Sequence, residues 1–174
     1  MKLLWITLMG VVVMWANTIM LPEHFKAAFV QTITNPKQKV IHYRGSVVYS
    51  ENNLFKWSYV EPTKKEVCTN GKEILVVDHD LEQISVYQID KGFDLMQILK
   101  SARLYKKHIY VTQYEGKNYT IKLNNKGQLQ SVLYYDDLDN KVQILFTKMK
   151  YGKGKLPALV IRCSYSADYD IIKG

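Results

Sequence analysis

The feature that most constrains the fold is a run of alternating aromatic residues, LFKWSYVEP, at residues 54–62. Side chains in a strand alternate between its two sides, so Phe55, Trp57 and Tyr59 share one face while Lys56 faces the other way. Three large aromatic side chains on one face must be covered by another part of the protein. The pattern therefore predicts a strand that belongs either to a filled β core or to the wall of a hydrophobic ligand cavity.

The composition is that of a globular, β-rich protein. Its 174 residues, 47% hydrophobic and 23% charged, suffice for one domain with a sizeable core. Thirteen tyrosines against nine glycines favour strands over helices. The net charge of +8 favours anionic membranes or acidic partners. No nucleic-acid-binding motif is present, so nucleic acid is not an expected partner.

The N-terminus has the pattern of a secretory signal peptide. Met1-Lys2 precedes an apolar run from Leu3 to Ala16, and such a run after a short positive end is typical of an exported protein. The run of about 14 residues is short for a membrane span, which needs about 20; an uncleaved anchor is the alternative. We expect residues 1–16 to be the signal peptide and residues 17–174 to be a single domain, soluble in the periplasm and monomeric.

Alternation and turn signals predict an antiparallel meander. Strands are expected at residues 39–50, 54–61, 66–69, 73–77, 83–89, 108–115, 118–124, 128–136, 141–149 and 158–165. Gly45 in the first of these indicates a bulge or a strong bend. Residues 21–34 fit a helix and a strand equally well. One helix is predicted from Phe93 to Leu104, ending in basic residues and packing its apolar side against the sheet.

The titratable residues give no sign of a catalytic or metal site. None of the four histidines has metal-ligand spacing with another histidine or with a cysteine. Residues 78–80 (DHD) fit a solvated turn, and residues 136–139 lack the glycine and closing glutamate of a calcium loop. We therefore expect a protein that is not an enzyme and that uses no cofactor or metal.

The chain has two cysteines, Cys68 and Cys163, both in segments expected to be strands. In an exported protein they can form a disulfide. The alternative is that both are small buried hydrophobic residues.

Several motifs, in their order and spacing, resemble one protein family. After the apolar N-terminus come FKAAFVQ at residues 25–31, YRG at 43–45 and the aromatic run at 54–62, followed by NGK at 70–72 and DHDLEQ at 78–83. Together they resemble the periplasmic outer-membrane lipoprotein carriers, the LolA family, over nearly the whole mature chain.

The resemblance implies a fold and a function. The fold is mainly β with a few helices: an open, incomplete antiparallel β-barrel covered by a helical lid, with Phe25 to Ile33 as the first strand. The function is that of a periplasmic chaperone, which takes triacylated lipoproteins from an inner-membrane ABC transporter. It shields their acyl chains and releases them to an outer-membrane acceptor, either a receptor or the bilayer.

The same resemblance implies a lipid-binding surface made of apolar side chains. Its expected members are Phe25, Phe29, Phe55, Trp57, Tyr59, Leu75, Val77, Phe93, Leu95, Met96 and Leu99. Many family members have Arg-Pro before the Asn-Leu-Phe run, where this chain has Glu51-Asn52, so the family's arginine latch to the lid is not carried over. Two alternatives remain open: a periplasmic lipid- or lipoprotein-sensing module of the same fold, and a structural β protein with a filled core.

Overall fold

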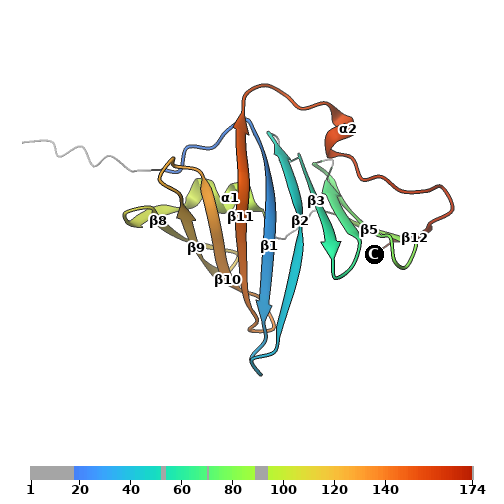
Figure 1. Cartoon of the computed structure of the whole chain (residues 1–174), viewed down its shortest axis with the longest axis horizontal. Helices are drawn as coiled ribbons and strands as arrows, with labels where there is room; N and C mark the ends of the chain where they lie inside the picture. Colours follow the sequence, from blue (N-terminus) through green and yellow to red (C-terminus); the bar gives the residue numbers. More distant parts are fainter. Residues whose placement is uncertain (1–17, 52–53, 70, 89–93, 174) are drawn as a thin grey trace, which may run out of the picture.

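The described residues form one twelve-stranded sheet and two short helices (Figure 1). The computed structural model describes residues 18–51, 54–69, 71–88 and 94–173. The strand order is β12-β6-β5-β4-β3-β2-β1-β11-β10-β9-β8-β7, antiparallel except for the parallel pair of β12 and β6. The sheet is not closed, because β12 and β7 are its two edges.

The elements have the following bounds. The strands are β1 (His24–Thr34), β2 (Val40–Ser50), β3 (Leu54–Glu61), β4 (Lys65–Thr69), β5 (Glu73–Asp78), β6 (Gln83–Gln88), β7 (Arg103–Lys106), β8 (Ile109–Tyr114), β9 (Lys117–Leu123), β10 (Leu129–Tyr135), β11 (Lys141–Gly152) and β12 (Asp170–Lys173). The helices are α1 (Leu95–Ser101) and α2 (Ala158–Ile161).

The predicted meander is confirmed for nine of its ten strands, and the ambiguous first segment is resolved. Residues 24–34 form β1, which pairs with β2 on one side and with β11 on the other. Phe25, Ala27 and Phe29 are buried and the residues between them are more exposed, as expected of a strand with one buried face. β1 thereby joins the N-terminal and C-terminal halves of the sheet.

Gly45 lies at the predicted irregularity in β2. The register between β2 and β3 shifts between Arg44 and Gly45. A Cβ atom on Gly45 would lie 1.9 Å from the carbonyl oxygen of Ser58, so only glycine allows β3 to approach this closely. The bulge expected from the sequence is confirmed.

Two segments differ from the sequence prediction. The predicted helix from Phe93 to Leu104 is too long: α1 ends at Ser101, and Arg103–Lys106 forms β7 by pairing with β8. Its first predicted residue, Phe93, lies outside the described residues. The strand predicted at 158–165 is wrong, because residues 158–161 form α2 directly after Pro157 and the following residues form no strand. Cys163 is therefore not in a strand.

The two faces of the sheet are covered by different parts of the chain. We call the face that carries Phe29 and Trp57 the inner face, and the face that carries Lys56 and Cys68 the outer face. The buried side chains of α1 belong to the same core cluster as those of the inner face. The C-terminal segment, residues 153–173, lies against the outer face, where α2 contacts β2 and β3 and Cys163 bonds to Cys68.

The predicted signal peptide, residues 1–16, lies outside the described residues. Within the described part of the chain, neither helix has the length and apolar character needed to cross a membrane.

Candidate functional site

The inner face carries a continuous cluster of aromatic side chains from the central strands. Trp57 on β3 is 8% exposed, and its ring lies 4.9 Å from Phe29 on β1 and 6.0 Å from Phe146 on β11. Further along β1, Phe25 stacks on Tyr49 of β2 at 5.3 Å. Residues paired across antiparallel strands point to the same face, so the register places these rings together. The alternation read from residues 54–62 thus extends across four strands.

Tyrosine side chains lie at one end of this aromatic cluster. The Tyr59 ring packs edge-on against Phe29 at 5.1 Å, and its hydroxyl donates to Oε1 of Gln31 at 3.2 Å. Burial, with a smaller effect from Tyr43, raises the pKa of Tyr59 to about 12. Burial also raises the pKa of Tyr134 on β10. These phenols are therefore neutral at physiological pH, and the only polar residues buried among the described residues, Ser50 and Thr69, are uncharged.

Helix α1 packs its apolar side onto the inner face. Its N-terminus is fixed by Asp94, whose carboxylate accepts hydrogen bonds from the backbone N–H groups of Met96 and Gln97. The helix buries Leu95, Met96, Ile98 and Leu99, which join the core cluster. The connection that contains α1 runs from β6, next to one edge of the sheet, to β7, the other edge.

The predicted lipid-binding residues divide between the two faces. Phe25, Phe29, Phe55, Trp57, Tyr59, Leu95, Met96 and Leu99 all lie in or against the inner-face cluster. Leu75 and Val77 pair with Cys68 and Glu66 and therefore point to the outer face. Leu75 lines a cavity of about 820 Å³ between β3–β5 and the C-terminal segment. Phe93 lies outside the described residues.

The inner face includes residues that the sequence reasoning did not select. Some come from β1, β2 and the α1 region: Ala27, Val47, Tyr49, Ile98 and Ala102. The others come from the second half of the sheet and from the segment before β1: Ile19, Tyr119, Ile121, Leu123, Leu129, Val132, Val142, Ile144 and Phe146. In β11 the signal was present, since Val142, Ile144 and Phe146 alternate with exposed residues. The same period of two that identified Trp57 would have found them.

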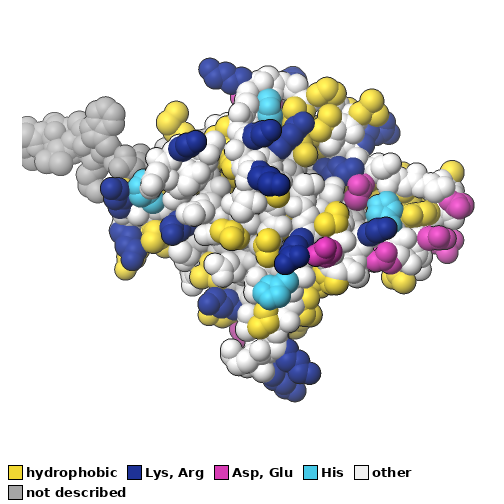
Figure 2. Space-filling view, viewed as in Figure 1, with side chains coloured by type: hydrophobic (Ala, Val, Ile, Leu, Met, Phe, Trp, Pro, Cys, Tyr) yellow, Lys and Arg dark blue, Asp and Glu magenta, His cyan; other side chains and the backbone are white. Residues whose placement is uncertain are grey.

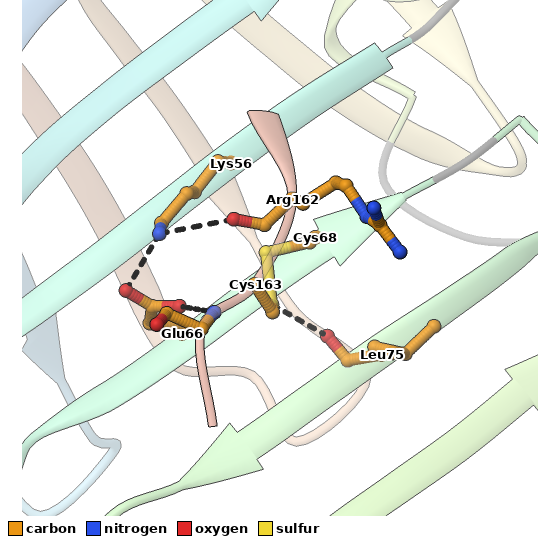
Figure 3. The surroundings of a disulfide bond; sticks show 7 residues. Lys56, Glu66, Cys68, Leu75, Arg162 and Cys163 are labelled. Atoms are coloured by element: carbon orange, nitrogen blue, oxygen red, sulfur yellow. Dashed lines mark hydrogen bonds and ion pairs between the residues drawn. A yellow bond between two sulfur atoms is a disulfide. The ribbon is translucent and has the colours of Figure 1, made fainter. Parts of the chain in front are cut away.

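The outer face is held by a disulfide with an ion pair beside it (Figure 3). Cys68 and Cys163 are bonded, with their Cα atoms 5.7 Å apart, so the disulfide alternative is the correct one. Lys56 Nζ lies 2.7 Å from Glu66 Oε1 and donates to the carbonyl of Arg162 at 3.1 Å. Glu66 Oε2 accepts from the backbone N–H of Ser164 at 2.8 Å. Three consecutive residues of the C-terminal segment are thus fixed to the sheet.

The acidic side chains of the described residues that lie in clusters have structural roles. They accept hydrogen bonds within turns, or they help to fix the C-terminal segment to the sheet. Glu66 lies near Cys68 and Cys163, but both sulfurs are bonded to each other and offer no thiolate ligand. Asp78 accepts from the N–H groups of the two residues that follow His79, as expected of a turn. Asp136 accepts from Leu138 and Asn140 and closes the β10–β11 turn.

Comparisons with known proteins give one consistent result. The sequence model of a family described as "Outer membrane lipoprotein carrier protein LolA" matches residues 22–100. An outer-membrane lipoprotein carrier protein of Campylobacter jejuni is 34% identical over 149 residues, which cover 86% of each chain. The protein of the same description from Wolinella succinogenes is 33% identical over 122 residues, covering 70% of this chain and 71% of that one.

Solved structures show the same fold at low sequence identity. An uncharacterised conserved protein of Thermus thermophilus has a TM-score of 0.58 at 11% identity, covering 88% of this chain and 92% of that one. A LolA superfamily protein of Nitrosomonas europaea has a TM-score of 0.50 at 12% identity, covering 85% of this chain and 94% of that one.

Proposed function

The chain belongs to the outer-membrane lipoprotein carrier protein (LolA) family, and we propose that its inner face is the surface that holds the acyl chains of its lipoprotein clients. As a member of this family it is a lipoprotein carrier and not an enzyme. One observation carries the assignment of the surface: strands from both halves of the sheet contribute to one aromatic-rich cluster of buried side chains, to which helix α1 adds four.

The chain length between β6 and β7 supports an open half-barrel with α1 as its lid. The two strands are ten positions apart in the sheet, which would be about 48 Å in a flat sheet. The connection, residues 89–102, contains seven helical residues and seven others. It can reach at most about 35 Å. A flat sheet does not meet this limit, whereas a sheet that curves toward its inner face, with α1 across the opening, does.

The free energy of burying the apolar side chains of α1 is comparable to that of taking one acyl chain out of water, and this suits a carrier. Burying the four apolar side chains of α1 contributes about 6–12 kcal/mol relative to exposing them. One long acyl chain contributes on the order of 10 kcal/mol when taken out of water. The return of α1 to the sheet thus offsets roughly the cost of releasing one acyl chain, and only part of the cost of releasing a client with three.

The partners follow from this role. We propose that triacylated lipoproteins are the clients, that an inner-membrane ABC transporter delivers them, and that an outer-membrane receptor or the bilayer accepts them. The proposed location is the periplasm, where family members act. The Cys68–Cys163 disulfide is compatible with that oxidising compartment.

The test is a lipid-extraction mass spectrum of the protein purified after incubation with lipoprotein-bearing spheroplasts, for wild type and for Trp57→Glu. We expect a soluble complex with lipoprotein for wild type. For Trp57→Glu we expect steep loss of the complex, because a carboxylate would lie where methylenes must pack. The matched control is Ile84→Ala, a buried position on the outer face.

The rival is a structural protein whose inner face is a permanently filled core. In that case wild type would yield no lipoprotein, and Trp57→Glu would lower the urea midpoint without any separate effect on binding. A Trp57→Glu protein that is folded and still carries lipoprotein normally would reject the inner face as the acyl-chain surface.

A further inference from the structure

The excess positive charge of the protein lies mainly in two parts of the chain. Residues 95–134 contain seven Lys and Arg residues and one acidic residue, Glu115, and residues 141–167 contain six Lys and Arg residues and no acidic residue. The first of these segments comprises α1 and β7 to β10, which form one end of the sheet. In Figure 2 dark-blue side chains lie at this end, near β8 and β9 as Figure 1 places them, and others lie over the rest of the view, several of them at the top centre.

The centre of this charge is the β7–β8 hairpin, at the free edge of the sheet. Arg103, Lys106 and Lys107 are exposed, and between them lies Tyr105, 70% exposed. A hydrogen bond of 2.9 Å from the N–H of Leu123 to the carbonyl of His108 joins the end of β9 to the hairpin turn. Lys122 and Lys126, both exposed, are therefore close to the turn, since Lys122 pairs with Ile109 and Lys126 is in the β9–β10 turn.

We call these five cations, together with Tyr105, the basic hairpin surface. Within the described part of the chain none of the five cations forms an ion pair. Glu115 is in the β8–β9 turn, at the opposite end of β8 from Lys107. The cations thus face solvent without a compensating charge at this end of the hairpin.

Lysines on an edge strand also prevent edge-to-edge aggregation, and that is the simplest explanation of Lys106. It does not account for Lys122 and Lys126, which lie away from the edge, nor for an exposed aromatic ring among the cations. An exposed tyrosine among long cationic side chains is typical of a bilayer interface, where the ring enters the headgroup layer and the cationic groups meet phosphates.

We propose that the basic hairpin surface docks the protein on an anionic phospholipid bilayer. Because β7 directly follows α1, docking would bring the bilayer next to the helix that covers the inner face. The relevance of docking to acyl-chain transfer rests on the function proposed above. The binding itself does not, since the surface is distinct from the inner face.

The test uses the full-length processed protein without cargo and vesicles of phosphatidylglycerol and phosphatidylcholine, with pure phosphatidylcholine vesicles as the comparison. Cosedimentation should show binding to the anionic vesicles only, weakened by raising the salt concentration. Replacing Lys106, Lys107 and Lys122 by Gln should weaken binding about fivefold for each cation, so about a hundredfold in total. Tyr105→Ser should weaken it further at high salt.

The matched control removes the same charge elsewhere, by replacing Lys37, Lys39 and Lys141 with Gln; all three are exposed. Equal losses in both triple variants would mean that net charge alone causes binding and would overturn the proposal, as would vesicle binding that the hairpin variant leaves unchanged. Absence of wild-type binding to anionic vesicles would overturn it too. If lipoprotein transfer from spheroplasts is normal in that case, the carrier function stands and only the docking surface falls.

Discussion

Ile98 gives the sharpest test of the competition between α1 and the acyl chain. Its side chain is fully buried on α1, in the inner-face cluster. Replacing a buried isoleucine by alanine costs about 2–5 kcal/mol. If the loaded carrier has α1 displaced from the sheet, Ile98→Ala destabilises the empty form and leaves the loaded form nearly unaffected. The variant should then hold lipoprotein more tightly than wild type.

The size of the effect follows from that free energy. A loss of about 3 kcal/mol in the empty form corresponds to roughly a hundredfold shift toward the loaded form, since each 1.4 kcal/mol is a factor of ten. This hundredfold shift is an upper limit, because a displaced helix that contacted the acyl chain would lose contacts in the variant too. The assay is the rate at which purified carrier–lipoprotein complex releases its client to acceptor vesicles, measured beside the urea midpoint of the empty protein.

Ile84→Ala is the control for this experiment, since it is the same substitution at a 2% exposed position on the outer face. It should lower the urea midpoint similarly and leave release unchanged. Faster release from Ile98→Ala, or slowing that is the same in both variants, would refute the displacement of α1.

Three further outcomes are expected. Replacing both Cys68 and Cys163 by Ser opens a loop with a sequence separation of 95 and should lower the free energy of unfolding by about 4 kcal/mol, while lipoprotein release stays normal; a large loss of release with an intact circular dichroism spectrum would contradict this. The pKa of Tyr59 is raised to about 12, so the stability from its neutral form is fully present below pH 10 and is lost as the pH rises through 12. Between pH 9 and pH 12 the free energy of unfolding of Tyr59→Phe should then fall by on the order of 2 kcal/mol less than that of wild type. An equal fall in both proteins, measured by urea unfolding at each pH, would contradict this. Gly45→Ala should cost about 1–3 kcal/mol in urea unfolding, because the new methyl group overlaps the carbonyl of Ser58; an unchanged midpoint would mean that β3 moves away freely.

The strands of this protein could be predicted because local sequence and tertiary packing agree. Where apolar and polar residues alternate between turn residues, as in β3 and β11, the period of two alone identifies the strand and its buried face. For β1 the local pattern allowed a helix as well, and its pairing with two neighbours decided the outcome.

The errors occur where a contact distant in sequence overrides the local pattern. The apolar spacing through Leu104 is helical, but pairing with β8 makes Arg103–Lys106 a strand. The C-terminal segment gave no signal for its position on the outer face, which depends on Lys56, Glu66 and Cys68 more than 90 residues earlier. Both sides of the strand that carries Leu75 and Val77 are apolar, so the alternation could not show on which face of the sheet these side chains lie. Only the pairing register with β4 shows that they lie on the outer face.

The attachment of the C-terminal segment divides the sheet into a braced half and an unbraced half. The segment passes over the outer face of β2 to β5 and ends by pairing with β6, and the disulfide makes one of its contacts covalent. On β8 and β9 the outer-face residues Val111, Thr120 and Lys122 are exposed. The strands that the C-terminal segment holds should therefore bend less easily than the strands without this attachment. If the inner face opens for a client, we expect the β7–β10 side to move and the β2–β6 side, which the C-terminal segment holds, to stay in place.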